Sequence, residues 1–216
     1  MMARNRISEK PRRTVLLVTA TEAEALYFSQ MRKDCRYANM TVVWEPEFKS
    51  LEHLITLASR RRNSENYSSA WVVFGLKDLD LDVKDVKDQQ AFATKKKVKL
   101  AWNNPSLGLW YLLHLQAPRG FVGDQSMIES ALAKQFPSYS GDASYLLTDG
   151  LDLHLKLYSS KSKAAVNAAA YNQLAVEKLG LAATTMVAML NDITEICGLA
   201  DLTHNQKRLG LGKQNG

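Results

Sequence analysis

The chain has 216 residues, 46% of them hydrophobic, which suffices for one α/β domain with a helical extension and excludes two large independent domains. No apolar run approaches the roughly 20 residues of a transmembrane helix, and residues 1–13 lack the apolar stretch of a secretion signal, so we expect a cytoplasmic protein with no membrane partner. The net charge of +6 is concentrated in residues 1–13 and 203–216, which argues against one broad basic face.

Short apolar runs alternate with amphipathic stretches between residues 14 and 116. Strands are predicted at 15–18, 41–44, 70–74 and 98–102, because each run is too short for a helix. Helices are predicted at 22–32, from the N-cap Ser50 to Arg62, in the polar stretch that ends at Lys97, and at 107–113. Four β–α units in succession predict a mostly parallel four-stranded sheet with helices on both faces.

Helical patterns dominate after residue 117, at 125–135, 162–179 and 184–197. We interpret residues 117–202 as a helical extension packed on a core of residues 14–116, with residues 1–13 and 203–216 as basic flexible ends. Parallel sheets bind ligands at the carboxyl ends of their strands. Functional side chains are therefore expected at 19–24, 46–50, 75–82 and 103–108.

Three segments of the chain are distinctive: VLLVTATEAEALYF at 15–28, WVVFGLKD at 71–78 and NNPSLGLWYLLHL at 103–115. They resemble the RloB-like family of bacterial defence proteins, and a weaker match covers 164–174 and 184–187. The resemblance implies a Toprim-like, Rossmannoid α/β fold and a role in abortive infection, a form of anti-phage defence. It also implies a common companion, an ABC-type ATPase encoded nearby.

The resemblance further implies a metal site for phosphodiester cleavage. In the family and its Toprim relatives a glutamate after the first strand and an Asp-x-Asp pair after the third bind the divalent ion, which stabilises charge on the phosphate and activates water. This chain departs from the pattern. Thr19 or Ala20 stands where the glutamate belongs, unless a short gap brings in Glu22, and Gly75 and Lys77 replace the aspartates. We therefore expect no catalytic residue, metal or cofactor.

The acidic series after the third strand keeps an alternative open. If that strand ran longer, Asp78 and Asp80 would form an Asp-x-Asp pair at the edge of the sheet, and Glu22 or Glu24 would face them. Such carboxylates would bind Mg²⁺. Alternating leucine and aspartate is also typical of a solvated loop that leads into a polar helix, which is the interpretation we adopt.

Two residues of the segment 107–115, Gly108 and His114, also bear on function. Gly108 stands where relatives often carry glutamate before Leu-Trp, which adds a third departure from the family's pattern. His114 matches a histidine of the family. A role in acid–base chemistry or phosphate contact stands beside the interpretation as a partly buried, hydrogen-bonded histidine.

Basic side chains form three candidate contacts with nucleic acid. They are Arg12 and Arg13; Arg60, Arg61 and Arg62; and Lys95, Lys96 and Lys97. Lysine and arginine bind backbone phosphates without further chemistry. The second and third groups fall at predicted helix ends, where the helix dipole alone favours cations.

Two classes of function follow from these observations. In the first, the chain is a nuclease-inactive subunit of an anti-phage system that binds a protein partner, nucleic acid or both. In the second, it is an active Mg²⁺-dependent nuclease on RNA or DNA that uses Glu22 or Glu24 with Asp78 and Asp80. The departures at the metal positions favour the first class.

Overall fold

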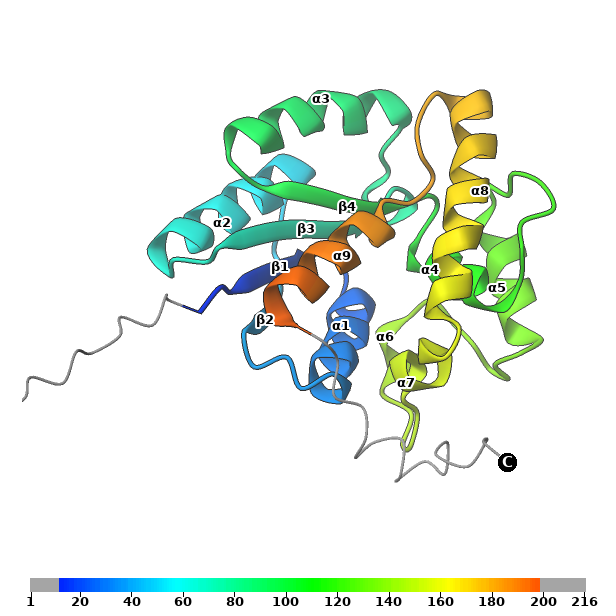
Figure 1. Ribbon diagram of the computed structural model, residues 1–216. Helices are drawn as coiled ribbons and strands as arrows, with labels where there is room; N and C mark the ends of the chain where they lie inside the picture. The colour runs from blue at the N-terminus through cyan, green and yellow to red at the C-terminus, as the bar shows by residue number, and fades with distance from the viewer. Residues whose placement is uncertain (1–11, 199–216) are drawn as a thin grey trace, which may run out of the picture.

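The four short apolar runs form one parallel sheet in the computed structural model, which describes residues 12–198 (Figure 1). The strands are β1 (Val15–Thr19), β2 (Met40–Trp44), β3 (Ser69–Gly75) and β4 (Lys99–Asn103). Their order is β2-β1-β3-β4, and every neighbouring pair is parallel. The prediction of an α/β fold with a parallel four-stranded sheet is confirmed. The basic ends predicted at residues 1–13 and 203–216 lie outside the described residues, apart from Arg12 and Arg13.

Helices cover both faces of this sheet (Figure 1). They are α1 (Glu22–Asp34), α2 (Leu51–Ser64), α3 (Val83–Lys95), α4 (Leu107–Leu115), α5 (Gln125–Ala133), α6 (Ala143–Leu146), α7 (Leu153–Tyr158), α8 (Lys161–Leu179) and α9 (Met186–Cys197). A short 3₁₀ turn, η1 (Lys77–Leu79), follows β3. Helices α2 and α3 lie on one face, and α1, α4 and α9 lie on the other. Every helix in this part of the chain is too short or too polar to cross a bilayer.

Alternating side chains of the central strands supply the two halves of the core. Val15 and Leu17 of β1 point into the cluster under α1, α4 and α9, whereas Leu16 and Val18 point into the cluster under α2 and α3. All four side chains are fully buried. A strand between two helical layers needs apolar residues at consecutive positions, which is why these runs read as continuous rather than alternating.

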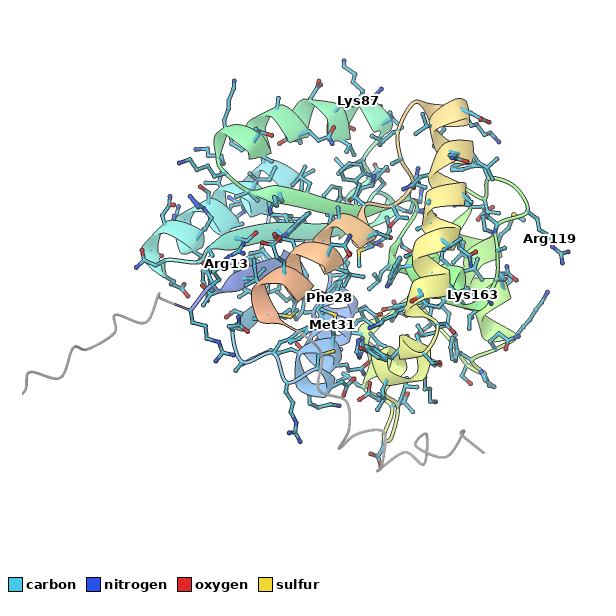
Figure 2. The ribbon with its side chains drawn as sticks, viewed as in Figure 1. Arg13, Phe28, Met31, Lys87, Arg119 and Lys163 are labelled. Carbon is cyan, nitrogen blue, oxygen red and sulfur yellow. The ribbon has the colours of Figure 1, made fainter. Side chains whose placement is uncertain are left out.

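Side chains outside the sheet divide in the same way between interior and surface (Figure 2). Phe28 and Met31 of α1 are buried in the cluster under α1, α4 and α9. Lys87 of α3 and Arg119, which follows α4, are exposed and project away from the ribbon. The apolar positions of α1 therefore face the sheet, and charged groups are left to the outer surface.

The helices after residue 117 pack on the first half of the chain. Helix α8 lies along α4, α5 also contacts α4, and α7 contacts α1. Helix α9 returns to the sheet, because the Asn104 N–H donates to the Ala183 carbonyl at 2.7 Å and the Thr185 N–H donates to the Trp102 carbonyl at 3.1 Å. The return brings Asp192 of α9 beside β3.

Candidate functional site

The carboxyl ends of β1 and β3 form the mouth of the sheet. The chain runs from β1 outward to β2 and then crosses to β3 on the other side of β1, so the topological switch point lies between β1 and β3. Open α/β sheets bind their ligands outside such a point. The first turn of α1, the turn η1 and the start of α4 meet there.

Glu24 reaches the mouth from the first turn of α1. Thr21 is the N-cap, its hydroxyl accepting from the Glu24 N–H at 3.2 Å, and Glu24 Oε2 accepts from the backbone N–H groups of Ala20 at 3.1 Å and Thr21 at 3.0 Å. This capping box fixes the side chain, which is 1% exposed. Its second oxygen, Oε1, is buried without a hydrogen-bond partner. Burial raises the pKa of Glu24 to about 8, and the charge of Asp78 adds to the effect.

Asp78 reaches the mouth from η1, and Gly75 makes room for it. A Cβ built on Gly75 would collide with Asp78 Oδ2 and would lie 2.8 Å from Ser106 Cα. The residue is exposed as a whole, but its carboxyl group lies against this backbone, where desolvation raises its pKa to about 6. Glycine at position 75 is therefore a steric requirement of this mouth, and an aspartate there would not fit.

A small cleft at the mouth is lined by Asp78 and the N-cap Thr21 and holds about 50 Å³ of free space. Its polar lining comprises Thr21, Asp78, Ser106, Gln125, Tyr139, Ser140 and Asp142. Ser106 Oγ donates to Gln125 Oε1 at 2.7 Å, and Gln125 Nε2 donates to Glu129 Oε1 at 2.7 Å. This volume is large enough for one or two water molecules or a small ion.

Packing of the extension also explains Gly108. A Cβ on this residue would lie 3.1 Å from the Tyr139 hydroxyl and 3.2 Å from Ile128 Cγ2. The space that a glutamate would need is thus occupied by side chains from α5 and from the segment after it. Sequence reasoning missed Gln125 and Tyr139, since neither belongs to a periodic pattern that points to this end of the sheet.

Of the four acidic candidates, Asp78 alone lines the cleft. Glu24 is buried without lining it, Glu22 is only partly buried, and Asp80 is exposed and adopts a left-handed backbone conformation with φ 52° at the end of η1. Asp82 caps α3, where its Oδ1 accepts from the Asp85 N–H at 2.9 Å and Asp85 Oδ2 accepts from the Asp82 N–H at 2.9 Å. The aspartate series therefore leads into a helix.

His114 lies at the far end of α4, away from the mouth. It is 3% exposed, and its Nδ1 lies 2.8 Å from the Trp110 carbonyl oxygen. A carbonyl only accepts, so Nδ1 carries the proton. Burial lowers the pKa of His114 to about 4. The histidine is hydrogen-bonded, as one of the two interpretations had it, but it is buried more deeply than the partly buried side chain of that interpretation.

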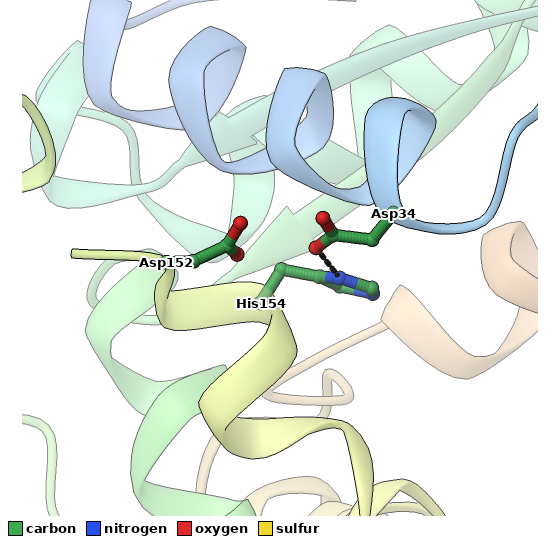
Figure 3. A group of neighbouring side chains, drawn as sticks. All are labelled: Asp34, Asp152 and His154. Atoms are coloured by element: carbon green, nitrogen blue, oxygen red, sulfur yellow. Dashed lines mark hydrogen bonds and ion pairs between the residues drawn. The ribbon is translucent and has the colours of Figure 1, made fainter. Parts of the chain in front are cut away.

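Within residues 12–198, three possible metal ligands converge at Asp34, Asp152 and His154, with ligand atoms within 4.8 Å of one another (Figure 3). Asp34 Oδ2 lies 2.7 Å from His154 Nδ1, and Asp152 Oδ2 lies 2.6 Å from the Lys33 ammonium. Although burial opposes it, Lys33 holds the pKa of Asp152 below its usual value. The ammonium group already occupies the position of a cation, so we interpret the cluster as an ionic joint between α1 and α7.

The basic candidates lie at the amino ends of the strands, the end of the sheet opposite the mouth. Arg60–Arg62 lie near the end of α2, and Lys95–Lys97 lie at the end of α3 and directly after it. Ser59 Oγ donates to the Lys96 carbonyl at 3.0 Å, which ties the two helix ends together. Arg12 and Arg13, both exposed, precede β1 at the same edge. The gathering follows from topology, because helices that connect parallel strands run back toward the amino ends of those strands.

A comparison with known protein families gives one match. The family model described as "RloB-like protein" matches residues 15–193, which include the whole sheet and most of α9. No curated protein and no solved structure matches the chain.

Proposed function

The chain belongs to the RloB-like family, and we propose that it is a nuclease-inactive, Toprim-fold component of a prokaryotic anti-phage system that binds nucleic acid, a protein partner or both. One observation carries the proposal: the basic groups and the mouth lie at opposite edges of the sheet. Strand β3 has seven residues, and at about 3.3 Å per residue it separates the two edges by roughly 20 Å. Nucleic acid bound at the basic edge does not pass the carboxyl groups of the mouth.

The mouth itself supports the same proposal. Cleavage needs space for a metal ion together with a scissile phosphate, and the cleft encloses about 50 Å³. One oxygen of Glu24 is committed to the cap of α1, and Lys77 adds a positive charge to the turn that carries Asp78. Together these features disfavour the binding of a metal ion at the mouth, because one positive charge, that of Lys77, is already there.

An exposed apolar stripe on α8 supports the binding of a protein partner. Val166 is 69% exposed and is followed at helical spacing by the exposed Ala169 and Ala170; Val176, 51% exposed, lies further along the same helix beyond the polar Gln173. Apolar stripes of this kind mark contact surfaces on soluble proteins. The partner that the family resemblance suggests is an ABC-type ATPase.

A cleavage assay tests the proposal. Wild type and Asp78→Ala/Asp80→Ala are incubated with labelled RNA and DNA in Mg²⁺ or Mn²⁺, beside a known nuclease as a positive control. We expect no cleavage by either protein, together with a gel shift whose strength falls steeply with salt. Metal-dependent cutting that disappears in the double variant would overturn the proposal.

The second candidate function is a Mg²⁺-dependent nuclease in which Glu24 and Asp78 bind the ion. It is favoured by one observation, the buried Glu24 Oε1 that lacks a partner next to Asp78. Magnesium is often held by one or two carboxylates, with substrate phosphates and water as further ligands. Titration with Mg²⁺ by calorimetry separates the two functions, since this candidate requires a binding signal that Glu24→Gln removes.

A further inference from the structure

A second cavity lies far from the mouth, between α1, α4, α7 and α9. It encloses about 300 Å³, near the lower end of the roughly 300–1,000 Å³ of protein ligand pockets. Its walls include Tyr27, Trp110 and Tyr158, and Lys161 and Thr194, both exposed, mark where it meets the surface. The cavity opens to the surface beside the main apolar cluster, so a ligand can enter it from solvent and reach apolar walls.

Two imidazole rings line this cavity, and the protein fixes the orientation of both. His114 Nδ1 donates to the Trp110 carbonyl, and His154 Nδ1 is held by Asp34. Figure 3 shows the His154 ring extending away from Asp152, with its second nitrogen clear of both carboxylates. The Nε2 atoms are therefore the ring atoms left for a ligand, and that of the neutral His114 is an acceptor.

Aromatic rings make up much of the wall and hold one another in place. Tyr27 and Tyr158 contact the His154 ring edge-on, with centroids 5.9 Å and 5.6 Å from it, and Trp110 contacts the His114 ring edge-on at 4.8 Å. Stacking of a base on aromatic side chains contributes about 1–3 kcal/mol. At the rim the Lys161 ammonium lies 4.4 Å from the centroid of the Tyr158 ring and donates to its hydroxyl at 2.8 Å.

From this arrangement we propose that the cavity binds a purine nucleotide. The base lies among the aromatic rings, its amino group donates to His114 Nε2, His154 contacts the same ring, and Lys161 pairs with the phosphate at the rim. The site is independent of the mouth, so the proposal stands whether or not the mouth cleaves nucleic acid. It assigns His114 and His154 to ligand recognition.

Isothermal titration of the full chain with AMP, adenosine and ribose 5-phosphate tests the proposal. We expect AMP to bind one to one, adenosine to bind within about tenfold of AMP, and ribose 5-phosphate to bind at least tenfold more weakly than AMP, since it lacks the base. Absence of any AMP signal up to millimolar concentration would overturn the site. Equal affinity for AMP and ribose 5-phosphate would also overturn it, because binding would then depend on phosphate alone.

Two variants locate the binding. Thr194→Trp places a bulky ring at the opening, and we expect it to weaken AMP binding at least tenfold. Asn191→Trp, on the same helix and exposed but outside the lining, is its matched control and should bind AMP within twofold of wild type. Tyr158→Ala removes an aromatic ring from the wall of the cavity and should weaken AMP binding at least fivefold. It replaces Thr194→Trp as the test if that variant does not fold. Wild-type affinity in the folded variants would place the ligand elsewhere and refute the proposal.

Discussion

Glu24 and Asp78 interact electrostatically at the mouth of the sheet, where burial raises the pKa of Glu24 and the charge of Asp78 raises it further. Glu24 arrives from the first turn of α1 and Asp78 from the turn after β3. Neighbouring parallel strands end at one edge, so residues distant in the sequence become neighbours there. Desolvation raises the pKa of both acids, so their ionisation at neutral pH lowers the stability of the fold. The pH dependence of stability therefore reports directly on this pair.

Glu24→Gln should remove a pH dependence of stability. In wild type the pKa of Glu24 in the folded state is about 8, above the ordinary 4.5. Between these two pH values the unfolded chain has released a proton that the folded chain keeps. The wild-type free energy of unfolding therefore falls as pH rises from about 4.5 to about 8. At 1.36 kcal/mol per unit, the loss between pH 5 and pH 7.5 is about 3 kcal/mol larger in wild type than in the variant.

Urea unfolding at the two pH values in EDTA measures this difference. Glutamine still accepts at this position of a capping box, so the helix start is preserved. Glu22→Gln, in the same turn but only partly buried, is the control and should keep the wild-type dependence. An unchanged slope in Glu24→Gln would show that this carboxyl group titrates normally.

Gly75→Ala should destabilise the fold by about 2 kcal/mol. The added methyl group would meet the Asp78 carboxyl group, and it would lie 2.8 Å from Ser106 Cα and 2.9 Å from the Pro105 carbonyl oxygen. Backbone atoms yield less readily than a side chain, so Asp78→Ala should not rescue the variant. Gly120→Ala, which meets nothing within 4 Å, is the control. Thermal melting distinguishes them, and equal melting temperatures would contradict the steric account.

Local sequence patterns predicted the strands of the sheet. They did not predict the side chains that reach the mouth from distant segments of the chain. The apolar runs that became β1 to β4 were readable because a parallel strand is buried on both faces. The sequence analysis left Glu22 and Glu24 as alternatives, and the capping box of Thr21 and Glu24 seen in the structure fixes which glutamate turns inward. Helices α6 and α7 have four and six residues, too few for a periodic signal. Gln125 and Tyr139 reach the mouth through tertiary packing, on which local sequence is silent.

Asp192→Asn should cost about 1–3 kcal/mol of stability. Asp192 Oδ2 accepts from Ser69 Oγ and Trp71 Nε1, both at 2.7 Å, and lies 3.0 Å from the Lys99 ammonium, so it fastens α9 to the sheet. Although burial opposes them, these partners lower its pKa. The stabilisation is therefore present at neutral pH and lost as pH falls through the lowered folded pKa.

The neighbouring ion pair on the same helix supplies the comparison. Glu195 lies 2.6 Å from Arg13, and both side chains are largely exposed. Exposed pairs contribute little because water and salt screen them. Glu195→Gln should therefore leave the chemical denaturation midpoint nearly unchanged, and a loss equal to that of Asp192→Asn would refute the assignment of Asp192 as the fastening residue.

Lys33→Met should destabilise the joint between α1 and α7 by about 1–2 kcal/mol. The variant leaves the buried carboxyl group of Asp152 without its cation, but the Lys33 side chain is itself 55% exposed, so solvent screens the pair and the cost is smaller than for a fully buried pair. Lys156→Met, an exposed lysine on α7, makes the same change without a buried partner. Urea unfolding of both proteins measures the difference, and equal midpoints would exclude an ionic joint.

Arg61→Glu/Lys96→Glu should weaken binding of nucleic acid at least tenfold in 100 mM salt. The hydrogen bond from Ser59 to the Lys96 carbonyl holds the ends of α2 and α3 together, so the two substitutions reverse charge within one surface. The salt dependence should also become less steep. For duplex DNA, the slope of log affinity against log salt concentration decreases in magnitude by about 0.9 for each phosphate that the variant no longer neutralises. Gel shifts over a series of salt concentrations measure both quantities. Lys134→Glu/Lys156→Glu changes the net charge equally on exposed residues of the extension, and an equal loss there would mean that overall charge, rather than the basic edge, governs binding.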